Sequence, residues 1–461
     1  MQKILAIAWL TWKAALRFRL FIVIAALLVV AVVGLPLIIK DDGTAAGFTQ
    51  IIITYTLSAV TMLLGISTLW LSCGTLARDI EECQIQVVAT KPIGRWQIWL
   101  GKWLGIAALN ATLLILAGAC IYGTLEWRAS KLPAVEQRNL RSQVLVARGS
   151  AKEQNYDDQI DAQAEQVLQE RLKTTPVTVA DLPEVRKQIR EQVKATFQLV
   201  PPNEVRVWQI DLGSAKNSLA NQPLQLRIKF NTADNNPNGT YVALWQIGDP
   251  NSTNYVQLMP MSLAPEAYHE FSIPPNLFND KGVLTIVFAN ANTTSLLFPL
   301  EDGMEVLYPD SSFTVNFIRA LGIIFCWLTL LSAIGLMSAS FLSFPVATFF
   351  ALTILIVALS SNTLAEIVSS GTMASGGSEG GGAPHSALDP IVMPLFKGIL
   401  IVLSLAETFS PIDALSTGHS IPWSELGRAF GQIIVLLGGA CAVVGIVLFN
   451  RRELASAQSQ Q

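Results

Sequence analysis

The chain has 461 residues, of which 51% are hydrophobic and only 14% are charged. A typical soluble domain has about 25% charged residues, so this composition argues against an ordinary cytosolic enzyme. The formal net charge of -3 offers no basic surface, and we therefore expect no nucleic-acid partner.

The charges are unevenly distributed along the chain. Residues 126–312 carry 39 of the 65 Asp, Glu, Lys and Arg side chains, which leaves 26 for the other 274 residues. The sequence therefore predicts one soluble block inserted into a membrane protein.

Residues 1–19 mix apolar side chains with Trp9, Trp12, Lys13 and Arg17. This composition is typical of a helix that lies in the membrane interface and contacts membrane lipids. We expect such a helix on the cytoplasmic leaflet. The alternative is an inward extension of the first span.

Long uncharged regions predict the membrane-spanning helices, because about 20 apolar residues are needed to cross a hydrocarbon layer of about 30 Å. These regions are residues 20–39, 48–77, 103–125, 320–365 and 429–450. The fourth is about twice as long as one crossing needs, and residues 338–345 interrupt it, so we interpret it as a helical hairpin. The sequence thus predicts a polytopic α-helical membrane protein with six transmembrane helices, three within residues 20–125 and two within 313–366.

Basic residues beside the spans predict the orientation, because short basic loops stay in the cytoplasm. Ten of the 14 Lys and Arg residues outside the soluble block fall on one side of the six-span arrangement. We expect both termini on that side, in the cytoplasm, and place the chain in a bacterial inner or plasma membrane. The exceptions are Lys40, Arg319, Lys397 and Arg428.

In this orientation, residues 126–312 form an inserted extracytoplasmic α+β domain. Residues 133–199 show apolar side chains at helical spacing and predict a helical stalk. Residues 201–305 contain period-2 alternation, as in Leu224, Leu226 and Ile228, which is the signature of half-buried strands. Short strands separated by Asn, Pro and Gly clusters predict a β-sandwich of jelly-roll type.

Four aromatic residues of this domain are candidate contacts for an envelope protein or a glycan, namely Trp208, Tyr241, Trp245 and Tyr255. The stronger interpretation is that aromatic residues at alternating strand positions fill the core. His269 has no Ser or Cys motif and no metal-ligand spacing around it, so we expect neither a catalytic nor a metal site there.

Residues 367–425 form a second extracytoplasmic segment. It begins with a Gly-rich stretch, residues 376–382, whose composition is typical of a flexible linker. Residues 391–405 are apolar but short, and we interpret them as a re-entrant or interfacial helix, with a seventh span as the alternative. Residues 426–461 contain the last span and a cytoplasmic tail.

The chain lacks the groups that would power transport. The span interiors contain no Asp, Glu, His, Lys or Arg, and residues 94–102 do not match the spacing of a phosphate-binding loop. All the cysteines lie in spans or on the cytoplasmic side, which excludes a disulfide framework in the external block. We therefore expect no enzymatic activity and no cofactor in this chain.

The cytoplasmic segment 78–95 predicts a short amphipathic helix. Its charged start contains Arg78, Asp79, Glu81 and Glu82, and a Lys-Pro stop at Pro92 precedes Arg95. Such a helix can dock into a cleft of a cytoplasmic protein. The alternative is a solvated loop.

This segment resembles that of the permease subunits of type-2 ABC exporters. The matching residues are Glu81, Glu82, Ile85, Val87, Val88, Pro92, Arg95, Gly101 and Lys102, whereas Cys83 and Gln84 stand where Gly and Thr are usual. Residues 344–347 and 449–454 also look like this family.

The resemblance implies a permease that pairs with a second permease copy, as a homodimer or heterodimer, and with two cytoplasmic ABC ATPase subunits. ATP and Mg would be bound by the ATPase, and the exported substrate would be a lipid, glycan or peptide. Coupling to the ATPase would fall to Arg78, Asp79, Glu81, Glu82, Pro92 and Arg95. The alternative is a membrane-anchored receptor or scaffold whose β-domain binds an envelope partner.

Overall fold

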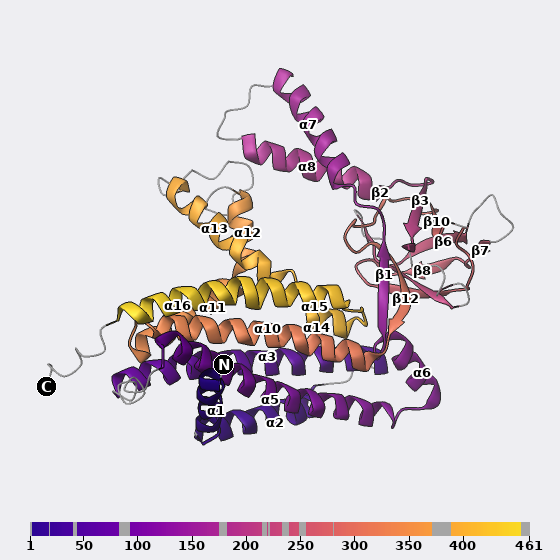
Figure 1. Ribbon diagram of the computed structural model, residues 1–461. Helices are drawn as coiled ribbons and strands as arrows, with labels where there is room; N and C mark the ends of the chain where they lie inside the picture. The colour runs from indigo at the N-terminus through magenta and orange to yellow at the C-terminus, as the bar shows by residue number, and fades with distance from the viewer. Residues whose placement is uncertain are drawn as a thin grey trace. The chain divides into compact units, whose positions relative to one another are not determined.

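The computed structural model describes residues 2–17, 19–39, 44–82, 93–174, 182–213, 219, 222–232, 239–248, 255–279, 281–370 and 389–452. The chain forms two compact units. The helical unit comprises Met1–Ala147, Ser311–Ser369 and Pro390–Gln461, and the β unit comprises Arg148–Asp310 and Ser370–Asp389. Figure 1 labels the helices and strands of both units.

Long helices make up the helical unit. They are α1 (Gln2–Arg17), α2 (Arg19–Ile38), α3 (Ala45–Glu81), α5 (Arg95–Ala129), α6 (Ala134–Gln143), α10 (Phe313–Ala339), α11 (Phe344–Leu359), α12 (Ser361–Ser370), α13 (Asp389–Glu407), α14 (Pro411–Ser416), α15 (Trp423–Ala429), the π-helix η2 (Phe430–Gly438) and α16 (Gly439–Arg451). Helices α15, η2 and α16 follow one another without a break.

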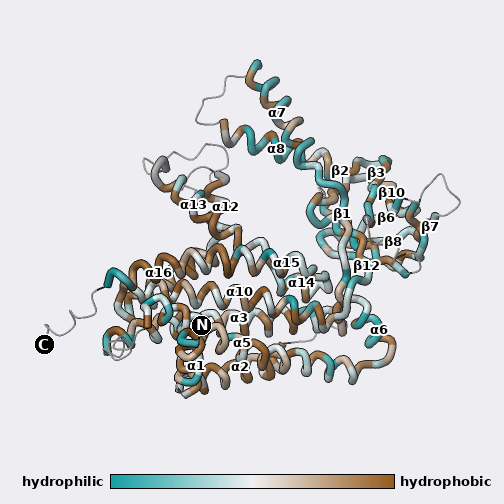
Figure 2. Tube along the Cα trace, viewed as in Figure 1, coloured by the Kyte–Doolittle hydropathy of each residue, from teal (hydrophilic) through white to brown (hydrophobic). Residues whose placement is uncertain are grey.

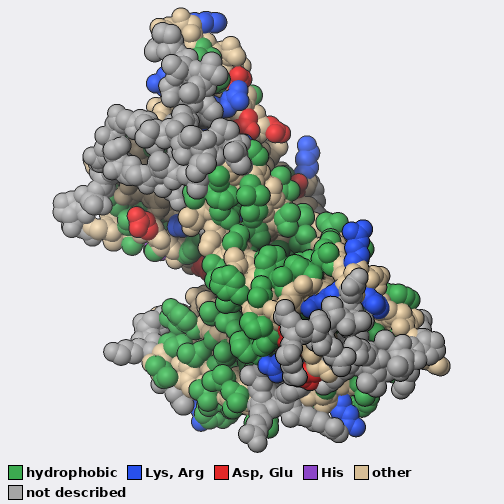
Figure 3. Space-filling model, turned by 90° about the vertical axis from the view of Figure 1, so that its left-hand side faces the viewer, with side chains coloured by type: hydrophobic (Ala, Val, Ile, Leu, Met, Phe, Trp, Pro, Cys, Tyr) green, Lys and Arg blue, Asp and Glu red, His purple; other side chains and the backbone are tan. Residues whose placement is uncertain are grey.

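Among the described residues, five helical segments are long and apolar enough to cross a membrane. They are Gly47–Glu81, Arg95–Ala129, Phe313–Ala339, Pro394–Ser416 and Trp423–Arg451. Figure 2 shows their hydrophobic character, and Figure 3 shows apolar side chains gathered on one face of the molecule. These helices support a multi-pass membrane protein with an additional β domain.

The boundaries of these helices differ from the expected six spans. The expected hairpin does break between α10 and α11, where residues 340–343 separate two helices. The first expected span, residues 20–39, corresponds to α2 (Arg19–Ile38), in which Ile22–Pro36 is a shorter apolar helix, and Phe344–Leu359 is another shorter apolar helix. The segment Pro394–Ser416, part of which was expected to be interfacial, has the length of a span.

Polar side chains link the central helices inside the apolar bundle. Thr68 on α3 donates to Oδ1 of Asn110 on α5 at 2.9 Å, and both residues are buried. Nε1 of Trp103 on α5 donates to the carbonyl oxygen of Thr329 on α10 at 3.0 Å. Bonds of this kind fix the register between helices in an apolar surrounding, where packing alone is less specific.

Helix α1 packs closely on α5 at two glycines spaced four residues apart. A Cβ at Gly101 would lie 2.7 Å from Cβ of Ile7, and one at Gly105 would lie 2.7 Å from the carbonyl oxygen of Ala8. Small residues at this spacing let two helix backbones approach each other. The helix predicted within residues 1–19 is present as α1, and its place in the membrane interface stays a prediction.

In the β unit, the described strands form three sheets. Its strands are β1 (Ala147–Lys152), β2 (Leu199–Val200), β3 (Val205–Asp211), β4 (Leu224–Ile228), β5 (Asn231–Thr232), β6 (Tyr241–Gly248), β7 (Tyr255–Gln257), β8 (Met261–Leu263), β9 (His269–Ile273), β10 (Val283–Asn290), β11 (Leu296–Leu297) and β12 (Met304–Ser311). The sheet orders are β1-β12-β4-β9, then β3-β10-β6-β7 with β8 on β6, and β2-β11-β5.

The two larger sheets share one hydrophobic core. Leu226 and Val306 from the first sheet and Trp208, Trp245 and Ile286 from the second belong to the same buried cluster. The alternation seen in the sequence places these side chains on the inner faces. The expected β domain is therefore confirmed, and its jelly-roll arrangement stays a prediction.

The predicted helical stalk, residues 133–199, is only partly helical. Helices α7 (Asp157–Thr174) and α8 (Leu182–Gln198) pack on each other through a small core that contains Ile160, Leu168 and Ile189. Residues 147–152, however, form strand β1 next to β12. Sequence patterning missed this strand because its residues, ARGSAK, do not alternate apolar and polar side chains.

Candidate functional site

The charged residues expected to start a separate coupling helix belong instead to the end of α3. Arg78, Asp79 and Glu81 lie in its last turn, and Glu82 is its C-cap residue. This corrects the predicted start of the helix at residue 78. Residues 83–92, which include Pro92, lie outside the described residues.

Asp79 forms an ion pair between the ends of α3 and α5. Its Oδ2 lies 2.5 Å from Nζ of Lys102, and that ammonium also donates to the carbonyl oxygen of Thr75 at 2.7 Å. The Lys102 side chain is 9% exposed and that of Asp79 is 32% exposed. A cation that is so nearly buried depends on a counter-charge and on hydrogen-bond acceptors.

Glu81 joins the same end of α3 to the start of α11. Its Oε1 accepts a hydrogen bond from the backbone N–H of Phe344 at 2.9 Å. The guanidinium of Arg78 lies 4.6 Å from the centre of the Phe344 ring. The first N–H groups of a helix have no partner inside the helix, and a carboxylate there also complements the helix dipole.

Arg95, the first residue of α5, binds the end of α16. Its Nη1 donates to the carbonyl oxygens of Phe449, Asn450 and Arg452 at 3.0, 2.9 and 3.0 Å. The last carbonyls of a helix lack intrahelical donors and carry the negative end of its dipole. A half-buried guanidinium therefore caps α16 from a different helix.

Arg452, which follows α16, in turn reaches the end of α10. Its Nη1 lies 3.3 Å from the carbonyl oxygen of Ala339 and 3.4 Å from that of Leu342. The contact places a second cation at the carboxyl end of a helix, beside the turn that leads to α11.

Together with the turn of residues 340–343 that joins α10 to α11, these contacts form a closed circuit of helix ends, which we call the helix-end ring. It consists of Arg78, Asp79, Glu81, Arg95, Lys102 and Arg452. It connects α3 to α5, α5 to α16, α16 to α10, and α11 back to α3. Four of the predicted coupling residues thus come together, but as partners of other helices rather than as a free docking face.

A second set of contacts lies at the other end of α10. Arg319 donates to the carbonyl oxygen of Ile421 at 2.9 Å, and its guanidinium lies 4.6 Å from the centre of the Trp423 ring. Asn316 donates to the carbonyl oxygen of His419 at 2.7 Å and accepts from the N–H of Ile421 at 2.8 Å. Arg319, an exception to the charge rule, is therefore engaged inside the protein.

The four aromatic candidates of the β unit separate into core and surface. Trp208, Tyr241 and Trp245 are at most 2% exposed. They pack in the sandwich core, so they are not available as ligand contacts, and the stronger interpretation of the sequence holds for them. Tyr255 is 48% exposed and stays a candidate contact.

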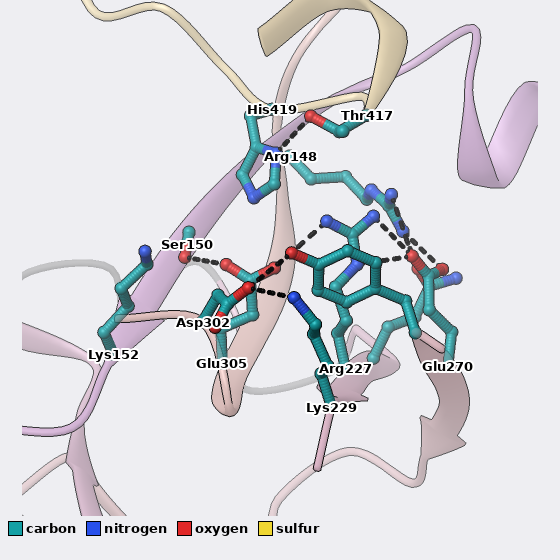
Figure 4. Close-up of polar contacts among 12 residues, drawn as sticks. Arg148, Ser150, Lys152, Arg227, Lys229, Glu270, Asp302, Glu305, Thr417 and His419 are labelled. Atoms are coloured by element: carbon teal, nitrogen blue, oxygen red, sulfur yellow. Dashed lines mark hydrogen bonds and ion pairs between the residues drawn. The ribbon is translucent and has the colours of Figure 1, made fainter. Parts of the chain in front are cut away.

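A ladder of charged side chains crosses the four-stranded sheet of the β unit (Figure 4). Glu270 on β9 accepts from Arg148 on β1 at 2.9 Å and from Arg227 on β4 at 2.5 Å. Arg227 also binds Glu305 on β12 at 3.0 Å. The ladder therefore joins β1 to β12, the first and the last of the described strands.

The ladder shifts the titration of its acids. Burial opposes the ionisation of Glu270, but hydrogen bonds and the charges of Arg148 and Arg227 outweigh it and hold the pKa of Glu270 below its usual value. Burial likewise opposes the ionisation of Asp302, yet bonds from Lys229 and Tyr268 lower its pKa. The side chains are matched in charge, and the described residues contain no group of His, Cys, Asp and Glu arranged to hold a metal.

Sequence reasoning missed Arg452 and the whole ladder. Glu270 lies 43 residues from Arg227 and 122 from Arg148, so no local motif connects them. Comparisons of the chain with protein-family models, with curated proteins and with solved structures gave no match.

Proposed function

We propose that this chain is the transmembrane permease subunit of an ABC exporter, in which separate ATPase subunits drive the export of a lipid, glycan or peptide. The proposal keeps six spans, cytoplasmic termini and an extracytoplasmic β unit. A second permease copy completes the transporter. The chain contributes no catalytic residue, and ATP and Mg belong to the ATPase.

The observation that carries the proposal is the helix-end ring. The segment that resembles the ATPase-coupling element of type-2 exporters is residues 78–95. Within its described parts, Asp79, Glu81 and Arg95 bond to α5, α11 and α16. A force applied by an ATPase between α3 and α5 would therefore reach α11 and α16 through short polar contacts.

The ring suits a mechanical role because its contacts join whole helices at their ends. Helices are stiff along their axes, so a displacement at one end is carried across the bundle rather than absorbed locally. Moving α3 against α5 would strain the Asp79–Lys102 pair and pull on α11 through Glu81. In the proposed transporter, this movement is passed to the second and fifth spans, α3 and α11, and opens the export path.

Glu82 is the described coupling residue that lies outside the helix-end ring, and it is exposed at the end of α3. The resemblance to type-2 exporters assigns it to the ATPase interface. Losing one partner of a charge pair at a partly desolvated interface costs about 2 to 5 kcal/mol. Glu82→Lys is therefore expected to weaken association with the ATPase while the helix-end ring remains intact.

The experiment is co-purification of the ATPase with full-length permease variants from membranes. Glu82→Lys is expected to reduce the recovered ATPase, whereas Glu165→Lys, an exposed charge on α7 of the β unit, serves as the matched control. Asp79→Asn is expected to retain the ATPase but to lower ATP-dependent export. Unchanged association in Glu82→Lys together with unchanged export in Asp79→Asn would contradict the proposal.

The orientation is tested by labelling single cysteines with a membrane-impermeant maleimide. Tyr255→Cys in the β unit is expected to react from outside, and Trp96→Cys at the start of α5 is expected to react only after the membrane is opened. Both side chains are about half exposed, so accessibility in the fold is matched. Labelling of both from one side would overturn the six-span orientation.

A receptor or scaffold is the second candidate, because the β unit is a compact unit with a core of its own. A receptor needs no ATPase. Recovery of the full-length chain from membranes with an envelope protein and without any ATPase would favour this second function over export.

A further inference from the structure

Among the strands that the structure describes, β3 is an edge strand of the five-stranded sheet in the β unit. It pairs with β10 on one side only, in an antiparallel register that places Val207 opposite Val287. With seven residues it is longer than the other strands at the ends of the two larger sheets, β1, β7 and β9. Figure 1 shows β3 beside β10.

The register shows which backbone groups of β3 face away from β10. The N–H of Leu212 bonds to Gly282, and Glu204 accepts from the N–H of Asn290. Hydrogen-bonded pairs alternate in an antiparallel ladder, so the even-numbered residues of β3 bond to β10. Within the described residues, the backbone groups of Val205, Val207 and Gln209 have no bonded partner on the other side.

The features that usually protect an edge strand are weak in β3. Edge strands are commonly blocked by Pro, by Lys, by a bulge or by a charge that points inward. The sequence VRVWQID contains neither Pro nor Lys, and none of its residues has a positive φ. Its inward charge, Arg206, is neutralised by Glu153 at 3.0 Å and lies 4.7 Å from the centre of the Trp208 ring.

The outer side of β3 is also apolar. Val205 is 59% exposed and Val207 is 52% exposed. Val287 and Ala289 lie opposite them on β10, and Leu244 lies next on β6. An added strand would therefore gain backbone hydrogen bonds at the edge and apolar contacts beside this patch.

We propose that β3 pairs with β3 of a second copy of this chain, antiparallel and about a two-fold axis, to form one continuous sheet. The strand is complementary to itself. With Val207 opposite Val207 of the other copy, Val205 faces Gln209 and Asp211 faces Asn203, so no like charges are opposed. The odd-numbered residues, whose backbone groups are free, then become the hydrogen-bonded pairs.

The same register aligns the core side of the strand. Arg206 would lie opposite Trp208 of the second copy, and this guanidinium already contacts its own Trp208 ring. The exposed side chains of Val205 and Val207 in each copy would lie beside those of the other copy across the interface. An isologous contact of this kind uses one surface twice and closes on itself. The inference adds a contact to the proposed pairing of two permease copies and needs no ATPase.

The test is cross-linking of the full-length chain in membranes with a short bis-maleimide reagent. Val207→Cys is expected to give a product at twice the mass of the chain. The matched control is Val242→Cys, an exposed position on the same face but on the inner strand β6, which is expected to stay monomeric. The native cysteines are common to both variants and set the background.

Two further measurements fix the register and separate the outcomes. Co-expressed Val205→Cys and Gln209→Cys chains are expected to cross-link with each other more than either does with itself. Adding Val207→Pro to both chains removes one backbone N–H from the edge of β3. It is expected to abolish the cross-link between the two chains. A Val207→Cys product no stronger than that of Val242→Cys, or a product with a different polypeptide, would overturn the β3 contact.

The mass of the wild-type chain in detergent distinguishes this inference from the proposed function. A dimer that lacks the Val207→Cys product would overturn the β3 contact and leave the permease pairing in place. A monomer would overturn both the pairing and this contact.

Discussion

The backbone N–H of Phe344 donates to Oε1 of Glu81 at 2.9 Å, across a separation of 263 residues along the chain. This bond places the end of α3 at the beginning of α11. It gives Glu81 a role in holding two helices together, so a charge reversal at this position would disturb the bundle itself.

The Asp79–Lys102 pair should respond unequally to the loss of either partner. Asp79→Ala leaves the nearly buried ammonium of Lys102 without a counter-charge and is expected to lower the free energy of unfolding by about 2 to 3 kcal/mol. Lys102→Met removes the buried charge and keeps the volume, so its cost should be smaller. Thermal unfolding in detergent measures both, and an equal loss would contradict this account.

Arg95→Met should release the end of α16. Its guanidinium binds three carbonyl oxygens, and the loss of a charged helix cap costs about 1 to 2 kcal/mol. Arg95→Lys should retain part of this stability, because a charge remains but fewer donors do. Arg451→Met, at an exposed position of the same helix end, is the control in the unfolding assay and should have little effect.

Gly101→Ala and Gly105→Ala should displace α1 from α5. The added methyl groups would meet Ile7 and Ala8 at 2.7 Å, a conflict that outweighs the gain of up to about 1 kcal/mol from replacing Gly in a helix. Gly123→Ala on the same helix meets nothing within 4 Å and should be neutral or stabilising. Limited proteolysis near residue 18 reports the release of α1, and equal cleavage in all three variants would refute the prediction.

Glu270 should make the β unit sensitive to acid. Its pKa is lowered in the fold, so its contribution is present above the unfolded pKa of about 4.3 and is lost as the pH falls through the folded value. Glu270→Gln should lower stability at neutral pH and flatten the acid dependence. Thermal scans between neutral and acidic pH test this, with Glu170→Gln, at an exposed position of α7, as the control.

Trp245→Ala should unfold the β unit, whereas Tyr255→Ala should not. Removing a fully buried Trp costs about 3 to 5 kcal/mol, while Tyr255 is half exposed at an edge strand. Tryptophan fluorescence during thermal unfolding separates the two variants. A β unit that stayed folded in Trp245→Ala would contradict its place in the core.

Much of the fold was predictable because it depends on local pattern. Uninterrupted apolar stretches identified the long helices, and the alternation at Leu224, Leu226 and Ile228 identified a strand of the sandwich. Strand β1 was not predictable in this way, since Ala147–Lys152 is a strand only because β12 lies beside it. Short or polar elements take their structure from distant neighbours.

The sequence identified several residues of the candidate site but not the contacts that they make. The charges at Asp79, Glu81 and Arg95 mark the ends of helices in the sequence, but their partners lie 23, 263 and about 354 residues away. The interpretation as a docking helix therefore missed their contacts with Lys102 and with the backbone of other helices. Capping by a residue from another helix leaves no local signature, because its partners are main-chain N–H and carbonyl groups, which occur all along the chain.

The π-helix η2 determines the direction in which the end of α16 faces. An α-helix turns by about 100° per residue, and a π-helix, with its bonds from i to i+5, turns by less. The carbonyl oxygens of Phe449 and Asn450 therefore face Arg95 only if the right number of residues in Phe430–Gly438 is π-helical. Deleting one residue from Phe430–Gly438 would rotate α16 about its own axis. The rotation would misalign the contact with Arg95, which lies two turns or more from the deletion.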